Sequence, residues 1–126
     1  MIDGIVMGTL TIDCSDEKRL CDFYQKLLGW EKCELYGHQA LKDPNERTTF
    51  LFIQEEDFAP PVWPEEPGKQ QKQIHLDFQV PDVDAAVRYT ESIGATKSKA
   101  QFGGEYFVTM FDPDGHPICL CAKDDA

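Results

Sequence analysis

Two stretches of alternating sequence place chemically useful side chains on one side of predicted strands. An imidazole, a carboxylate and an amide take every second position in His75, Asp77 and Gln79, and two thiols do the same in Cys119 and Cys121. Successive side chains of a strand point to opposite faces, so each set shares a face. Imidazole, thiolate and carboxylate groups bind zinc, and a thiol beside an imidazole can act as a nucleophile beside its base. His75 and Cys119 are therefore candidate catalytic residues.

The elements that position these side chains occur twice along the chain. The segment 9–13 alternates like a half-buried strand, 15–17 supplies a helix N-cap with acids in the first turn, and an apolar stripe then runs to Gly29, where a left-handed cap is expected. The same pattern returns from Ile74. The predicted helices are 17–28 and 83–93, and the predicted strands are 9–13, 31–35, 38–41, 48–54, 75–80, 96–100, 105–111 and 117–122.

The two halves align residue by residue, with Thr9 on His75, Ile12 on Phe78 and Asp16 on Asp82. A tandem repeat is the simplest explanation. The sequence therefore predicts an α+β fold of two βαβββ modules. We expect a single domain over 1–126, with a first half at about 5–54, a linker at 55–73 and a second half at 74–123.

The linker is polar and rich in proline around Trp63. Connections longer than about 12 to 15 residues in a compact domain are usually lids or linkers. Trp63 is therefore expected either to close over a ligand or to pin the linker to the sheet.

The strand pattern also assigns the positions that face a cavity. Apolar positions pack on the helices, so the alternate positions line the opposite, concave face. If the last hairpin is centred on Pro113–Asp114, Tyr106 lies opposite Cys121. In 48–54 the residues Leu51 and Ile53 suit the core, which turns their neighbours inward. The predicted ligand-binding residues are Thr9, Thr11, Phe52, Gln54, Trp63, His75, Asp77, Gln79, Tyr106, Cys119 and Cys121. The alternative is that the polar positions face water on an open sheet.

Composition limits the partners. The 126 residues include 12 Lys plus Arg against 23 Asp plus Glu, a net charge of -11. Such a surface repels nucleic acid and anionic membranes and favours a cationic ligand. No apolar run is long enough to span a membrane and no signal peptide is evident, so a cytoplasmic protein is expected. Five cysteines without a C-x-x-C pair predict reduced thiols.

Several motifs together carry a family resemblance. They are Phe23-Tyr24-x-x-Leu27-Leu28-Gly29-Trp30, the segments 73–80 and 83–95, and Asp112-Pro113-Asp114-Gly115-His116-Pro117. With these, the sequence resembles the glyoxalase, bleomycin-resistance and ring-cleaving dioxygenase superfamily, the vicinal oxygen chelate fold. The resemblance implies a homodimer in which paired modules curl a mixed sheet into a partial barrel, with the helices on the outer face.

The resemblance also implies four metal-binding points in metal-dependent members. Here those points are Thr9, Phe52 or Gln54, His75 and Cys119, of which only His75 is a usual ligand. We therefore expect no cofactor, and we do not expect the protein to catalyse the glyoxalase I reaction. If a divalent metal binds, His75 would hold it, with Cys119 and either Asp77 or Cys121 forming a softer set.

Three functions follow as hypotheses. The first is a metal-free, glyoxalase-like protein that binds a small molecule, such as a drug or antibiotic. The second is a metal-dependent lyase, isomerase or dioxygenase with a non-standard metal site. The third is a structural homodimer whose cavity is filled by its own side chains.

Overall fold

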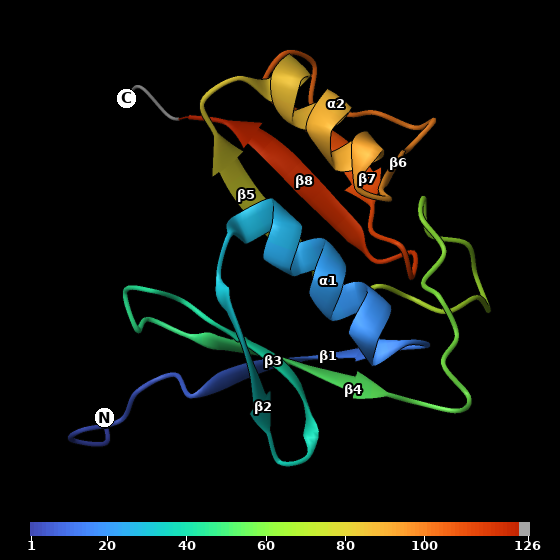
Figure 1. Ribbon diagram of the computed structural model, residues 1–126. Coiled ribbons are helices and arrows are strands. Elements are labelled where there is room, and N and C mark those ends of the chain that lie inside the picture. Colours follow the sequence, from blue (N-terminus) through green and yellow to red (C-terminus); the bar gives the residue numbers. More distant parts are fainter. Residues whose placement is uncertain (124–126) are drawn as a thin grey trace. The chain divides into compact units, whose positions relative to one another are not determined.

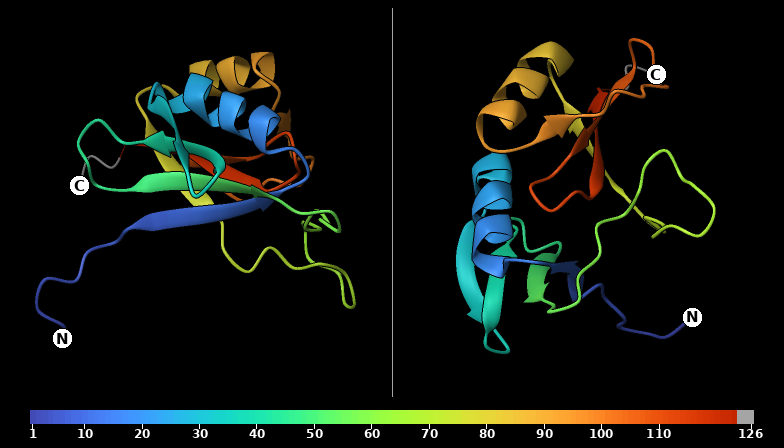
Figure 2. Two further views of the ribbon diagram at one scale, coloured as in Figure 1. Left: turned by 60° about the horizontal axis from the view of Figure 1, so that its bottom comes forward. Right: turned by 90° about the vertical axis from the view of Figure 1, so that its right-hand side faces the viewer.

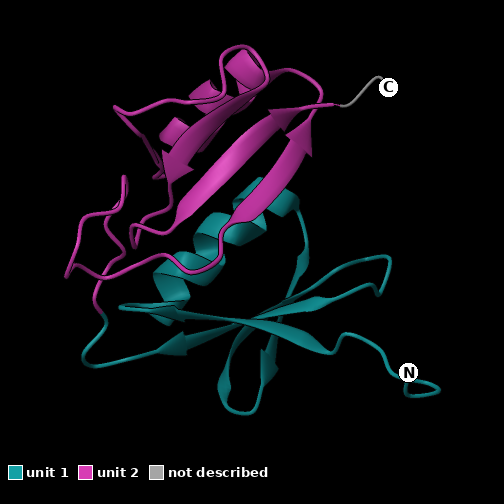
Figure 3. Cartoon of the chain, turned by 180° about the vertical axis from the view of Figure 1, so that it is seen from behind, with its two compact units in different colours: residues 1–58 teal, residues 59–126 magenta. Residues whose placement is uncertain are grey.

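The structure is a computed structural model that describes residues 1–123, so the last three residues of the predicted domain lie outside it (Figure 1). The chain divides into two compact units, 1–58 and 59–126 (Figure 3). The second unit takes in most of the predicted linker. Each unit has its own sheet and its own helix.

The first unit is a four-stranded mixed sheet with one helix. In chain order its elements are β1 (Thr9–Cys14), α1 (Glu17–Leu28), β2 (Glu31–Leu35), β3 (His38–Lys42) and β4 (Thr49–Gln54). The strand order is β1-β4-β3-β2, with β1 and β4 parallel and the other pairs antiparallel. The Asp16 carboxylate caps α1 by accepting the Arg19 N–H, and Gly29 ends the helix at a φ of 71°.

The second unit repeats this plan. Its elements are β5 (Leu76–Val80), α2 (Val83–Ser92), β6 (Thr96–Lys97), β7 (Phe107–Phe111) and β8 (Pro117–Ala122). The strand order β5-β8-β7-β6 matches that of the first unit position by position. Figure 2 shows each helix lying along one face of its own sheet. The predicted α+β fold of two βαβββ modules is therefore confirmed.

Two strands of the second unit are at least two residues shorter than predicted, and β5 begins one residue late, at Leu76. β6 ends at Lys97 instead of 100, and β7 begins at Phe107 instead of 105. The Gln101 side-chain amide takes the place of a neighbouring strand, because it donates to the Thr109 carbonyl at 2.8 Å and accepts the Thr109 N–H at 2.9 Å. A side chain therefore satisfies backbone groups that a longer β6 would have paired.

The predicted facing of β4 is wrong. Phe52 is 0 % exposed and its ring stacks on Tyr24 of α1, with ring centroids 5.9 Å apart. In the β1–β4 ladder Phe52 pairs with Ile12, so its side chain lies on the helix face. β4 carries apolar residues on both of its faces, so the alternation of polar and apolar residues does not determine which face packs on the helix. The larger aromatic rings fill the space beneath the helix, and Leu51 shares the opposite face with Thr11.

Within residues 1–123, neither helix has the length and apolar character that crossing a membrane requires.

The buried thiol of Cys21 predicts a loss of stability at alkaline pH. Cys21 is fully buried in α1, and this burial raises its pKa from 9.0 to about 11. The thiol therefore ionises at lower pH in the unfolded chain than in the folded protein. The stability that comes from burying the neutral thiol is complete below pH 9 and is lost as pH rises through about 11. We expect the free energy of unfolding to fall by roughly 2 to 3 kcal/mol more in the wild type than in Cys21→Ala over that window.

Urea denaturation at a series of pH values measures this effect. Cys33→Ala is the matched control, because that thiol is only half-buried, and it should keep the wild-type slope. Parallel pH profiles for wild type and Cys21→Ala would contradict the prediction.

Candidate functional site: a pocket in the second unit

A pocket of about 300 Å³ opens in the second unit. Its apolar wall consists of Trp63, Phe102, Phe107 and Pro117. Its polar lining consists of Lys72, His75, Thr109 and Cys119. A concave, mainly apolar site with a few polar groups is the usual form of a small-molecule pocket, and this volume suits a small ligand.

Three neighbouring strands supply a row of polar side chains to this face. Cys119 of β8 pairs with Asp77 of β5 on one side and with Thr109 of β7 on the other. Ile118 and Leu120 are fully buried, so Cys119 between them points to the opposite face. The Thr109 hydroxyl lies 3.5 Å from the Cys119 sulfur.

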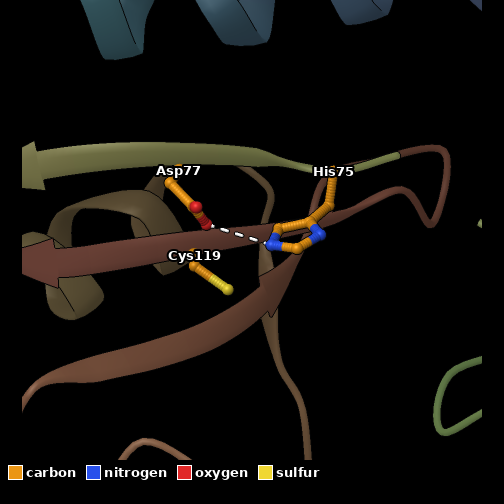
Figure 4. A group of neighbouring side chains, drawn as sticks. All are labelled: His75, Asp77 and Cys119. Atoms are coloured by element: carbon orange, nitrogen blue, oxygen red, sulfur yellow. Dashed lines mark ion pairs between the residues drawn. The ribbon is translucent and has the colours of Figure 1, made fainter. Parts of the chain in front are cut away.

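His75 joins this row from the residue before β5. Its Nε2 lies 3.1 Å from Asp77 Oδ1, and ligand atoms of His75, Asp77 and Cys119 all lie within 4.8 Å of one another (Figure 4). The predicted pattern of alternating polar residues therefore brings an imidazole, a carboxylate and a thiol to one place.

The setting of Cys119 favours the protonated thiol. The side chain is 7 % exposed, and burial raises the pKa of Cys119, as does the nearby charge of Asp77. The hydrogen bond between Thr109 and Cys119 and the charge of Lys72 lower this pKa. In Figure 4 the Cys119 sulfur lies on the same side of the His75 ring as Nε2, the nitrogen that already contacts Asp77. In the relay of a catalytic triad the two ring nitrogens face different partners, so this geometry does not favour a thiolate nucleophile.

The segment predicted as a linker, 55–73, contributes Trp63 and Lys72 to the pocket of the second unit. The Val62 N–H donates to the Gln70 carbonyl at 2.8 Å and closes the loop between them. Trp63 packs edge-on against Phe102, with centroids 6.1 Å apart. The Lys72 ammonium lies 3.8 Å above the centre of the Trp63 ring. Trp63 thus stands in the pocket wall, held by an aromatic contact and a cation.

Of the residues predicted for the site, Trp63, His75 and Cys119 line the pocket and Asp77 lies beside it. Gln79 and Cys121 form the next pair along the same face of β5 and β8. The remaining five lie elsewhere. They are Thr9, Thr11, Gln54 and Tyr106, together with Phe52, described above.

Thr9 and Thr11 lie on the face of β1 that turns away from α1, paired with Thr49 and Leu51. A cavity shared by both halves stays a prediction. Gln54 is instead used at the start of α1, where its side-chain oxygen accepts the Glu17 N–H at 3.2 Å. The prediction that Gln54 faces a cavity is wrong, because the helix N-terminus needs an acceptor.

The placement of Tyr106 is also wrong. Tyr106 precedes β7, is 69 % exposed, and donates its N–H to the Gly103 carbonyl. Phe107, one residue later, is the partner of Cys121. The turn holds an odd number of residues between Phe111 and Pro117, so the register differs by one from a turn centred on two residues.

Sequence reasoning missed four lining residues besides Pro117. A hairpin centred on Asp114 alone would have placed Phe107 opposite Cys121 and Thr109 opposite Cys119, as the structure does. Lys72 and Phe102 come from irregular segments, where alternation gives no signal.

Gly103 leaves room for the pocket wall, which predicts a cost for any side chain there. A Cβ on Gly103 would lie 2.3 Å from the Phe107 carbonyl oxygen and 2.6 Å from its ring. We expect Gly103→Ala to push the start of β7 aside and to lower the free energy of unfolding by roughly 1 to 3 kcal/mol. Gly8→Ala is the control, because a Cβ there meets nothing within 4 Å. Equal thermal stability of the two variants would contradict the prediction.

The fold and the pocket define a two-module α+β protein with an open pocket of about 300 Å³ in its second module. The chain belongs to the glyoxalase-like domain family, whose sequence model matches residues 9–121. None of the curated proteins compared with the chain matches it.

Solved structures share the fold at low sequence identity. A glyoxalase/bleomycin resistance protein/dioxygenase family enzyme from Burkholderia phytofirmans PsJN is 16 % identical, with a TM-score of 0.69 over 94 % of this chain and 98 % of its own. TnmS3, an antibiotic-binding protein from Streptomyces sp. CB03234, is 17 % identical, with a TM-score of 0.63 over 98 % and 100 %. The oxidase ChaP-H2 is 16 % identical, with a TM-score of 0.66 over 96 % and 95 %. The fold therefore serves both binding proteins and enzymes.

Proposed function

We propose that this protein binds a small aromatic molecule in the pocket of its second unit and needs no metal to do so. The observation that carries the proposal is the pocket itself, an open volume of about 300 Å³ between three aromatic rings with polar groups along one side. Aromatic walls bind planar ligands by burial and ring contact, and a few polar groups fix the orientation. The likeness to an antibiotic-binding protein agrees with this proposal.

The four points implied by metal-dependent relatives support binding without a metal. Thr9 is a weak ligand, and Phe52 packs under α1. On the other face of β4, Leu51 and Ile53 offer no ligand either. Of these four points only His75 and Cys119 can hold zinc, one fewer than the three protein ligands of a catalytic zinc.

Titration calorimetry on chelator-treated protein tests the proposal, with neutral naphthalene-2-carboxamide as the probe. We expect saturable binding that Phe107→Ala weakens roughly tenfold or more, since an aromatic side chain that the ligand covers contributes more than about 1.4 kcal/mol. Tyr36→Ala is the control, because Tyr36 is exposed in the first unit. Absence of binding, or equal affinity in Phe107→Ala, would overturn the proposal.

A metal centre is the second candidate function. The convergence of His75, Asp77 and Cys119 within 4.8 Å favours it. Zinc bonds of about 2.0 to 2.3 Å would bring tetrahedral ligand atoms to roughly 3.5 Å apart, so the three side chains would have to move together. With an open coordination position, such a centre would suit a metal-dependent lyase, isomerase or dioxygenase.

Cobalt(II) distinguishes the two candidates. A metal centre predicts a thiolate-to-cobalt absorption band that Cys119→Ser and His75→Ala abolish and Cys33→Ser keeps. No such band at millimolar cobalt would remove this candidate.

The third hypothesis, a filled cavity, has less support. It needs Phe52, Trp63 and Tyr106 to occupy the cavity, yet Phe52 packs under α1, Tyr106 is exposed and the pocket is open. A homodimer remains part of our proposal, and sedimentation equilibrium should give twice the chain mass of 14.3 kDa. A 14.3 kDa species at micromolar concentration would contradict it.

A further inference from the structure

The pocket lining includes a lysine, whose charge is opposite in sign to the net charge of the chain. The two ionisable basic residues in its lining are Lys72 and His75, and no carboxylate belongs to the lining. The carboxylates that pair with them, Glu65 and Asp77, lie outside it. A ligand in the pocket therefore meets a positive group first, although the net charge of the chain is -11.

The ammonium of Lys72 is held in place at the pocket. Its side chain is 16 % exposed, its Nζ lies 2.9 Å from Glu65 Oε1, and the Trp63 ring lies beneath it at 3.8 Å. Its charge reaches the polar side of the pocket, where it acts to lower the pKa of Cys119 against the larger effect of burial. An ordered cation of low exposure loses little further freedom when it binds a ligand.

We propose that the ligand is a planar aromatic anion, such as an aromatic carboxylate, with its ring against Phe107 and Trp63 and its anionic group on Lys72. This inference rests on the proposed binding function and names the class of ligand. It replaces the cationic ligand that net charge alone favours, because a field inside a pocket is set by the nearest groups.

Glu65 lowers the affinity of Lys72 for an anionic ligand, because its carboxylate already pairs with the ammonium. An ammonium has three donors, so Lys72 can hold Glu65 and a ligand carboxylate together. The two carboxylates then repel each other at close range. Removing the charge of Glu65 therefore leaves Lys72 more available to the ligand, and Glu65→Gln is expected to bind the anion several-fold more tightly.

Three probes with one ring system and different charges test the inference by titration calorimetry. They are naphthalene-2-carboxylate, naphthalene-2-carboxamide and 2-naphthylmethylammonium. The wild type should bind the carboxylate roughly tenfold more tightly than the carboxamide, and the ammonium most weakly, as a charge-assisted hydrogen bond at low exposure predicts.

Variants of the lysine locate the preference. Lys72→Gln should remove the tenfold advantage of the carboxylate and keep the affinity for the carboxamide, and Lys72→Arg should retain the advantage. Lys69→Gln is the matched control, because Lys69 is an exposed lysine of the same segment.

The outcomes separate the two proposals. Equal affinity for carboxylate and carboxamide, tightest binding of the ammonium, or an advantage that survives in Lys72→Gln would overturn the anionic ligand and leave the binding function standing. No binding of any of the three probes would overturn both.

Discussion

Replacing Phe52 by alanine is expected to lower the free energy of unfolding by about 3 to 5 kcal/mol. The Phe52 ring is fully buried and stacks on Tyr24 beneath α1, with Phe50 at its edge. Its removal leaves a cavity that the surrounding strands of the first unit cannot close, so both the transfer free energy and the packing contacts are lost. Denaturation in urea, followed by circular dichroism, measures the change.

The same variant separates a core residue from a pocket residue. Phe52→Ala should keep the wild-type affinity for naphthalene-2-carboxamide at a temperature where it is folded, whereas Phe107→Ala should lose that affinity at a smaller cost in stability. A Phe52→Ala protein that stays within about 0.5 kcal/mol of the wild type, the range of surface substitutions, would show that this ring does not support α1.

Replacing Asp112 by alanine is expected to cost about 3 kcal/mol of stability. The carboxylate is fully buried and accepts the N–H groups of Asp114 and His116, both at 3.0 Å. It also contacts His116 Nδ1 at 2.8 Å. Without it, the turn between β7 and β8 keeps polar groups with no acceptor inside the protein, and each such group costs about 1 to 3 kcal/mol.

Because this turn sets the register of β8, the loss should extend to the pocket. Asp112→Ala is expected to weaken naphthalene-2-carboxamide binding, since Cys119 and Thr109 are aligned by that register. Asp112→Asn, which keeps one acceptor oxygen, should fall between alanine and wild type, and Asp3→Ala on the exposed N-terminal segment should have no effect. Equal stability of the asparagine and alanine variants would contradict this account of the turn.

The sequence predicted the repeat well because its signals are local. The caps at Asp16 and Gly29, and the alternation that placed Asp77 and Cys119 on one face, depend on near neighbours along the chain. The two halves carry the same signals, so the assignment of each half supports that of the other.

The errors arose where a tertiary contact decides. Phe52 was misplaced because β4 is apolar on both faces and only the size of the space under α1 selects one. Tyr106 was misplaced because the Asp112 carboxylate sets the length of the turn. Lys72 could not be found from its own neighbours, because its role depends on how the loop returns to Trp63.

A nuclear magnetic resonance titration of chelator-treated protein with naphthalene-2-carboxamide tests directly whether the pocket binds an aromatic molecule without a metal. We expect the largest shift changes to fall on the Trp63 indole, Phe107 and Thr109, and saturation to occur without added metal. Changes centred on the first unit, or binding that begins only when zinc is added, would contradict it.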